Sequence, residues 1–204
     1  MRLLKVGFEK CKSEPCMFTC GEVVCIVYVD DCLFYAPSQQ HIDIVFDEMR
    51  KTDLDFEIEN ELAGFLGVKV NNREDGSIEL LQTGLIDRVI LALGLEGANA
   101  KAIPAEHNPL GSYVDGEERN EHFNYASVVG MLMYLTGNSR PELAFSVHQC
   151  ARFTHNPKAS HEKALKRIGQ YLIGTRTKGL ILCPKVDLNV EMFVDADFAG
   201  LLGF

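Results

Sequence analysis

The sequence has 204 residues, of which 47% are hydrophobic and 24% are charged, and its formal net charge is −9. This composition suits a globular protein with a core, and no apolar run approaches the ~20 residues of a membrane-spanning helix. The N-terminus carries no signal-peptide apolar segment, and the seven cysteines are scattered without a C-x-x-C pair. We therefore expect no membrane partner, no disulfide framework and no zinc site, and a reducing location in the cytoplasm or nucleus.

Charge is distributed unevenly along the chain. Acidic residues dominate residues 43–61, whereas basic residues dominate residues 152–178. The net negative charge argues against a simple nucleic-acid-binding protein, but a local basic segment can still contact phosphates. The basic side chains of this segment are Arg152, Lys158, Lys163, Lys166, Arg167, Arg176 and Lys178.

The first predicted elements are three strands, at residues 16–19, 23–27 and 32–35. The last two are short apolar runs rich in β-branched and aromatic residues, which favours largely buried strands. Between them stand the adjacent carboxylates Asp30 and Asp31. Asp favours turns over strands, so we expect both residues at the tip of a tight hairpin. Adjacent carboxylates repel each other, and a site that keeps both ionised usually contains a cation; the alternative is a solvated hairpin tip.

Two helices and a second hairpin are expected before residue 97. Apolar residues at helical spacing predict a helix with Ser38 as its N-cap. Strands over residues 65–70 and 77–82 predict the hairpin, because turn residues separate them. Thr83 is expected to cap the other helix, which ends at Gly94.

Residues 97–122 are punctuated by Gly and Pro and show little periodicity, which indicates a linker. Three helical patterns follow it. The first ends at Gly137, the second opens with a capping box at Ser139, and the third runs from Pro157 to Ile173. The last predicted elements are strands at residues 180–183 and 191–194. The expected fold class is α+β.

The third of these helices has one apolar and one basic face. Its apolar stripe is formed by Ala164, Leu165, Ile168 and Leu172. This spacing leaves Lys163, Lys166 and Arg167 on the outer face. The face is either a phosphate-binding surface or an ordinary solvated helix surface.

Ordered motifs along the chain resemble the C-terminal part of a Ty1/copia-type retrotransposon reverse transcriptase. Tyr28-Val29-Asp30-Asp31 resembles the active-site box of that family, and Phe65-Leu66-Gly67-Val68 resembles its FLG strand. Four further segments resemble motifs of the family. Residues 125–136 resemble its YRxLVGxLxYLT helix and residues 139–145 its TRPDIxFAV motif. Residues 151–153 resemble its SRF motif and residues 193–200 its YSDADWAG motif. The resemblance extends from Leu3 to Gly200.

The resemblance implies a division of the chain into four parts. Residues 1–96 would be a partial reverse-transcriptase palm of antiparallel hairpins and helices, and residues 97–122 a linker. Residues 123–185 would be a helical thumb or connection region. Residues 186–204 would begin a truncated ribonuclease H domain.

The resemblance also implies functional roles. Polymerases of this kind use two Mg²⁺ ions ~3.5–4 Å apart, so Asp30 and Asp31 would be catalytic residues and metal ligands. Tyr28 would pack near the primer terminus or, alternatively, bury its ring as an ordinary strand aromatic. The partners would be an RNA/DNA primer–template duplex and, in the intact family, a deoxynucleoside triphosphate. The remaining assignments are a primer grip at Phe65, Leu66 and Gly67, nucleic-acid contacts at Lys163, Lys166 and Arg167, and a ribonuclease H remnant at Asp195.

In this family a third catalytic Asp lies on a strand upstream of the region that matches this chain. We therefore expect a weak, incomplete Mg²⁺ site and little or no polymerase activity from the chain alone. A first alternative is a non-catalytic nucleic-acid-binding module derived from a retrotransposon polyprotein, in which the basic helix makes the contacts. A second is an unrelated metal-dependent nuclease, although nothing in the sequence brings its two candidate carboxylate pairs together, which are Asp30 with Asp31 and Asp195 with Asp197.

Overall fold

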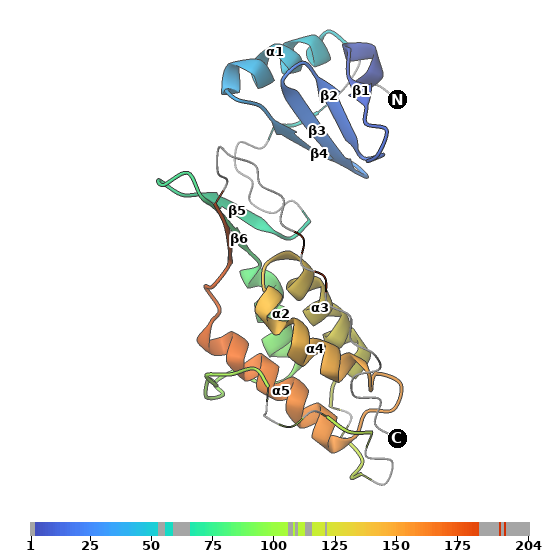
Figure 1. The fold of residues 1–204 in the computed structure, drawn as a ribbon, viewed down its shortest axis with the longest axis vertical. Helices are drawn as coiled ribbons and strands as arrows, with labels where there is room; N and C mark the ends of the chain where they lie inside the picture. The colour runs from blue at the N-terminus through green and yellow to red at the C-terminus, as the bar shows by residue number, and fades with distance from the viewer. Residues whose placement is uncertain are drawn as a thin grey trace. The chain divides into compact units, whose positions relative to one another are not determined.

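The computed structural model describes residues 3–52, 56–58, 66–105, 108, 110–112, 116–120, 122–183, 192 and 194. The chain forms two compact units, residues 1–65 and residues 66–204. Each unit combines an antiparallel sheet with helices (Figure 1). The predicted α+β fold class is therefore confirmed, while the palm and thumb assignments remain predictions.

A four-stranded antiparallel sheet forms the base of the first unit. Its strands are β1 (Glu9–Lys10), β2 (Met17–Cys20), β3 (Val23–Tyr28) and β4 (Asp31–Tyr35), side by side in chain order. A short 3-10 helix, Leu3–Val6, precedes them. In β3 the side chains of Val23 and Cys25 are buried and that of Val24 is half-buried, the alternation expected when one face of a strand lies against a core.

Helix α1 (Gln39–Arg50) packs against one face of this sheet (Figure 1). Its buried side chains are Val45, Phe46 and Met49. They join the inward residues of β2 and β3 in a single core, as the helical periodicity predicted. Ser38 holds the N-cap position with extended backbone, but its hydroxyl hydrogen-bonds His41 Nδ1 at 2.7 Å instead of capping a backbone N–H.

A three-stranded antiparallel sheet belongs to the second unit. Strands β5 (Lys69–Asn72) and β6 (Ile78–Leu81) form the predicted second hairpin, and β7 (Leu180–Leu182) pairs with the other edge of β6. The backbone N–H and hydroxyl of Ser77 donate to Asp75 at 3.0 and 2.5 Å, which closes the hairpin turn. A Cβ at Gly179 would collide with the Leu80 carbonyl oxygen, so the close approach of β7 requires glycine at that position.

Helices make up the rest of the second unit (Figure 1). They are α2 (Thr83–Ala92), α3 (Tyr125–Asn138), the 3-10 helix Pro141–Leu143, α4 (Ala144–Ala151) and α5 (Ala159–Gly174). Side chains from all four α-helices meet in one core, including Val89, Leu132, Val147 and Leu165, each fully buried. Because α2 contributes to this core, the division between compact units falls at residues 65 and 66 and does not coincide with the predicted linker at 97–122.

Two predicted helix caps are wrong. Thr83 is the first residue of α2, and the residue at the N-cap position is Gln82, which makes no side-chain cap. The Ser139 hydroxyl donates to Gln82 Oε1 at 2.8 Å instead of closing a capping box. Both side chains are buried, so this long-range hydrogen bond satisfies polar groups that would otherwise lie unpaired in the core.

Within the part of the chain that the structure describes, no helix is both long enough and apolar enough to cross a membrane. The seven cysteines are free thiols.

Candidate functional site

The hairpin of β3 and β4 places the two adjacent carboxylates at its tip, as predicted. Tyr28 pairs with Asp31 at the end of the ladder, so Val29 and Asp30 form a two-residue turn. Asp30 and Asp31 are exposed. Tyr28 is 53% exposed, which excludes the alternative of a buried strand aromatic.

Val29 adopts a strained backbone conformation at this tip. Its φ is +54°, a left-handed value at the first central residue of the turn, as in a type II′ hairpin. A β-branched residue in this region costs of order 1–3 kcal/mol. Val29 is also 81% exposed, so no burial of its side chain offsets that cost. The pairing of β3 with β4 therefore compensates the strain at Val29, and the turn determines the positions of Asp30 and Asp31 at the end of the sheet.

Asp30 and Asp31 offer the type of ligand that Mg²⁺ prefers, but too few ligands to hold it. Mg²⁺ prefers oxygen ligands in octahedral geometry, and Asp30 and Asp31 provide such oxygens from one turn. Among the described residues, no group of three or more His, Cys, Asp or Glu side chains could hold a metal ion. Two carboxylates from one hairpin are therefore fewer ligands than an octahedral Mg²⁺ site needs.

A pair of thiols lies just behind the hairpin tip. Cys32 is exposed, and Cys25 is buried in the core. The register places them diagonally on the same face of the sheet, because Cys25 is opposite Phe34 and Cys32 is opposite Val27. A hydrogen bond with Cys25 lowers the pKa of Cys32 to about 7, and the same bond raises the pKa of Cys25.

The segment predicted as the primer grip is only partly described. Phe65 lies outside the described residues. Leu66 and Gly67 do not form the predicted strand: they make a turn with φ of +56° and +73°, and β5 begins at Lys69. The Tyr134 hydroxyl on α3 donates to the Leu66 carbonyl oxygen at 2.6 Å. This hydrogen bond spans 68 positions of sequence, so periodicity could not have predicted the turn.

The apolar stripe predicted for α5 is confirmed, with Leu165, Ile168 and Leu172 fully buried and Ala164 half-buried. On the other face Lys163 is exposed, while Lys166 and Arg167 are half-buried. Lys166 Nζ lies 2.7 Å from Glu162 Oε1 one turn earlier, which partly neutralises its charge.

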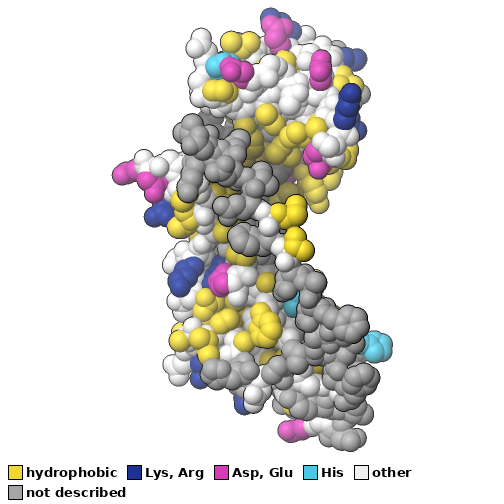
Figure 2. Space-filling model, in the orientation of Figure 1, with side chains coloured by type: hydrophobic (Ala, Val, Ile, Leu, Met, Phe, Trp, Pro, Cys, Tyr) yellow, Lys and Arg dark blue, Asp and Glu magenta, His cyan; other side chains and the backbone are white. Residues whose placement is uncertain are grey.

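Ion pairs neutralise further cations of the basic segment. Lys158 pairs with Glu118 in the preceding segment. Arg176 donates to the Asp87 carboxylate through Nε at 2.6 Å and through Nη2 at 2.5 Å. On the side of the second unit seen in Figure 2, the Lys and Arg side chains are scattered and form no continuous patch. The excess of basic residues in the sequence therefore overstates the charge available to a nucleic acid.

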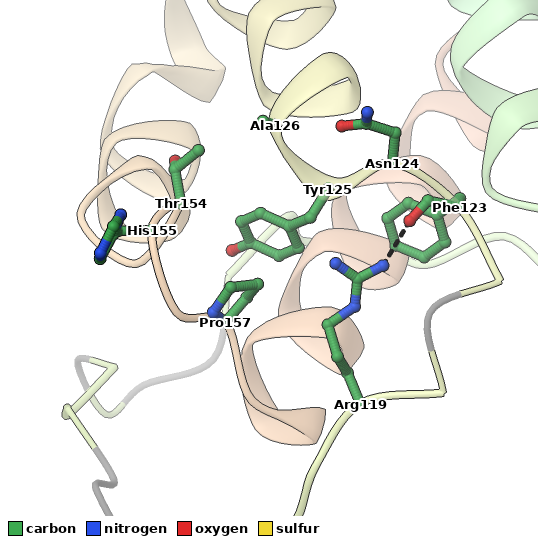
Figure 3. A pocket seen from close by; sticks show the side chains of 8 residues that line it. All are labelled: Arg119, Phe123, Asn124, Tyr125, Ala126, Thr154, His155 and Pro157. Atoms are coloured by element: carbon green, nitrogen blue, oxygen red, sulfur yellow. Dashed lines mark hydrogen bonds between the residues drawn. The ribbon is translucent and has the colours of Figure 1, made fainter.

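An open pocket of about 500 Å³ lies beside the start of α3 (Figure 3). Arg119 lines this pocket, and its guanidinium contacts other residues of the protein. It donates to the Phe123 carbonyl oxygen, and its Nε lies 3.6 Å from Glu162 Oε2. The guanidinium also lies over the rings of Phe123 and Tyr125, at 5.3 and 5.8 Å. These contacts fasten the segment before α3 to α5.

Three buried polar side chains in the second unit have structural roles that the motifs alone did not reveal. His161 accepts from the Lys158 N–H at 2.9 Å, so its other nitrogen donates to the Gly111 carbonyl oxygen at 2.8 Å. Arg140 is 1% exposed and is bonded to the end of α5. Glu162 bridges Arg119 and Lys166. For His161 and Glu162 the available signal was a polar residue at a position of α5 that faces the core. Arg140 precedes the 3-10 helix Pro141–Leu143, so helical spacing gave no such signal for it.

The predicted ribonuclease H remnant at Asp195 lies outside the described residues, as does Asp197. The predicted strand at 191–194 falls largely there too, since only Met192 and Val194 of it are described.

Two of the proteins that are similar to this chain are Pol polyproteins of plant transposons. The chain is 29% identical to the Retrovirus-related Pol polyprotein from transposon RE1 of Arabidopsis thaliana, over 97% of the chain and 14% of the relative. It is 30% identical to the corresponding polyprotein from transposon TNT 1-94 of Nicotiana tabacum, over 95% of the chain and 15% of the relative. An uncharacterized mitochondrial protein of Arabidopsis thaliana is 27% identical over 86% of the chain and 71% of its own length.

The chain thus spans about one seventh of the length of the Pol polyproteins that it matches. No family model matches the sequence, and no solved structure matches it significantly. The homologues of this chain are Ty1/copia-type retrotransposon Pol polyproteins, and the match is consistent with a fragment of such a polyprotein.

Proposed function

We propose that the chain is a segment of a Ty1/copia-type RNA-directed DNA polymerase, in which the β3–β4 hairpin contributes two catalytic carboxylates. The observation that carries this proposal is the two-residue turn that exposes Asp30 and Asp31 at the end of a packed sheet. It occurs in a chain whose homologues are retrotransposon Pol polyproteins.

In this proposal Asp30 and Asp31 offer oxygen ligands from one side of the catalytic centre. Bound Mg²⁺ would supply activation of the primer 3′-hydroxyl and neutralisation of the triphosphate. Tyr28 pairs with Asp31 across the hairpin, and its exposed ring would pack near the primer terminus. The strained turn at Val29 would keep Asp30 and Asp31 in a fixed position at the end of the sheet.

The chain alone would have little or no polymerase activity. Both candidate ligands come from one hairpin, and the described residues offer no third ligand near them. Mg²⁺ is held better by carboxylates from separate strands than by one turn. Binding of the metal by this hairpin would accordingly be weak.

The duplex partner would be held by the second unit. Lys163, Lys166 and Arg167 lie on the side of α5 that faces away from its core, where they could contact backbone phosphates. Contacts of this kind read an A-like duplex by shape rather than by sequence. Because Lys166 is paired with Glu162, we expect its contribution to be smaller than that of the exposed Lys163.

A second candidate function is duplex binding without catalysis. The basic side chains on α5 favour this second function, because they could bind a duplex whether or not the β3–β4 hairpin is catalytic. Primer extension and hybrid binding by the purified chain test the predicted inactivity of the isolated chain and the proposed duplex partner. We expect binding of an RNA–DNA hybrid together with extension at background level, for both the wild type and Asp30→Asn. Mg²⁺-dependent extension that Asp30→Asn abolishes would show that the chain provides a further ligand, and absence of hybrid binding would refute the proposed partner.

A further inference from the structure

Two thiols on neighbouring strands of the first unit lie against each other behind the hairpin tip. Cys25 on β3 lies opposite Phe34 on β4. Cys32 precedes Phe34 by two residues, so the two cysteines are diagonal neighbours on the same face of the sheet. Their thiols are hydrogen-bonded to each other. Cys25 is fully buried and Cys32 is exposed, so an oxidant in the solvent meets Cys32 first, with a second sulfur directly beside it.

The fold holds these two cysteines to different degrees. Cys25 belongs to the core between the sheet and α1. Phe34, its partner across the strands, packs edge-on against Phe46 of α1 at 5.0 Å between ring centroids. Cys32 lies close to the turn instead, where Val29 is 81% exposed. Because a close-packed core resists displacement, a force that draws the two sulfurs together would move the hairpin tip rather than the core.

A disulfide between the two cysteines would require a small movement of this kind. Diagonal residues of an antiparallel pair have Cα atoms about 7–8 Å apart. A disulfide usually joins Cα atoms about 4.4–6.8 Å apart. Closing the bond would therefore shift Cys32 toward Cys25 by about 1 Å. Asp31 directly precedes Cys32 in the chain, so the same shift would displace the carboxylates at the tip.

We propose that Cys25 and Cys32 form a redox switch, in which a peroxide oxidises the pair to a disulfide and the disulfide displaces the tip of the β3–β4 hairpin. The Cys32 sulfur attacks one oxygen of hydrogen peroxide, and the O–O bond breaks to give a sulfenic acid at Cys32 and one water. The Cys25 sulfur then attacks the Cys32 sulfur, the S–O bond breaks, and a second water leaves with the Cys25 proton. The two thiols lose two electrons in total, and the peroxide gains them.

Formation of the disulfide does not depend on metal binding by Asp30 or Asp31. In the polymerase proposed above, a displacement of these ligands by about 1 Å would lower the rate of primer extension. That consequence alone rests on the proposed function. A small dithiol such as dithiothreitol would reverse the switch by thiol–disulfide exchange.

The test oxidises the full chain with hydrogen peroxide at one fixed pH, blocks the remaining thiols with N-ethylmaleimide, and maps disulfides by mass spectrometry. Cys32→Ser removes the exposed member of the pair and leaves the core unchanged. Cys16→Ser is the matched control, because it removes another exposed thiol of the same unit. Hydrogen exchange of the amides of residues 28–31, before and after oxidation, measures the displacement of the tip.

In the wild type and in Cys16→Ser we expect the Cys25–Cys32 disulfide in most molecules after oxidation. Exchange at residues 28–31 should then be at least about twofold faster than in the reduced chain, because strain at the tip favours local opening. Dithiothreitol should restore the slower exchange, and Cys32→Ser should show no change on oxidation. Absence of the Cys25–Cys32 disulfide from the oxidised wild type would overturn the switch. A disulfide that leaves the exchange unchanged would overturn the displacement of the tip, and neither measurement needs a metal ion or a nucleic acid.

Discussion

Arg140 and Thr175 are joined by two hydrogen bonds across 35 positions of sequence. Arg140 Nη1 donates to the Thr175 carbonyl oxygen at 3.0 Å, and Nη2 contacts the Thr175 hydroxyl at 2.7 Å. Thr175 is the C-cap of α5, so the guanidinium satisfies a carbonyl group that the helix leaves unpaired. The same guanidinium lies over the Tyr171 ring at 5.6 Å. This arrangement connects the turn after α3 to the end of α5.

We expect Arg140→Lys to destabilise the second unit by about 2–4 kcal/mol, because an ammonium cannot reproduce the planar fork that contacts Glu142 through Nε and Thr175 through Nη1 and Nη2. Chemical denaturation followed by circular dichroism measures the loss. Arg176→Lys is the control, since Arg176 makes a similar two-point contact with Asp87 where both side chains are about half exposed. That control should cost at most about 1 kcal/mol. Equal losses for the two variants would contradict the structural role assigned to Arg140.

The thiol of Cys32 should react unusually fast near neutral pH. The hydrogen bond from Cys25 lowers the pKa of Cys32 to about 7, so about half of it is thiolate at pH 7. Alkylation by iodoacetamide, mapped by mass spectrometry over a pH series, should be half-maximal near pH 7 at Cys32. It should also be faster there than at the exposed Cys16 and Cys183.

Removal of the hydrogen-bond donor is the control for this prediction. In Cys25→Ala the pKa of Cys32 should rise, so the half-maximal pH of its alkylation should move upward. Since a thiol deprotonates as the pH rises, the variant should react more slowly than the wild type at pH 7 and equally fast well above pH 9. An unchanged pH profile would mean that Cys25 does not act on Cys32.

Duplex binding by the second unit should depend steeply on salt. If Lys163, Lys166 and Arg167 each neutralise one phosphate, the log–log slope of affinity against salt is roughly −3. Changing Lys166 and Arg167 together to Gln should flatten it by about two units, and by less if Glu162 keeps Lys166 from the phosphate. The matched control changes Lys10 and Lys12 in the first unit to Gln, which removes the same charge elsewhere. A slope that responds equally to both double variants would show that α5 makes no local contact.

The features that could be predicted from the sequence are those set by neighbouring residues. The β3–β4 hairpin followed from two apolar runs and an Asp-Asp turn, and the buried stripe of α5 followed from its spacing. Both depend on patterns within about ten residues of the chain, where periodicity and turn preference act directly.

The features that could not be predicted depend on distant partners. Leu66 was expected in a strand, but the hydrogen bond from Tyr134 holds it in a left-handed turn. Ser139 had the spacing of a helix cap, but it is buried against Gln82. The basic character of residues 152–178 was visible in the sequence, whereas the pairing of Arg176 with Asp87 required the fold. Long-range polar pairing was the deciding interaction in each case.

The proposal that this hairpin is part of a polymerase active site is tested most directly in a chimera. The chain would replace the matching segment of an active Ty1/copia-type reverse transcriptase, and Mg²⁺-dependent extension of a primer on an RNA template would be measured. Asp43→Asn, on the exposed surface of α1, removes the same charge away from the hairpin and serves as the control. We predict extension by the chimera and by the control, and a loss of at least about a hundredfold with Asp30→Asn, since a metal ligand contributes several kcal/mol to the transition state. An active chimera that retains its rate with Asp30→Asn would contradict the assignment of this hairpin to the catalytic centre.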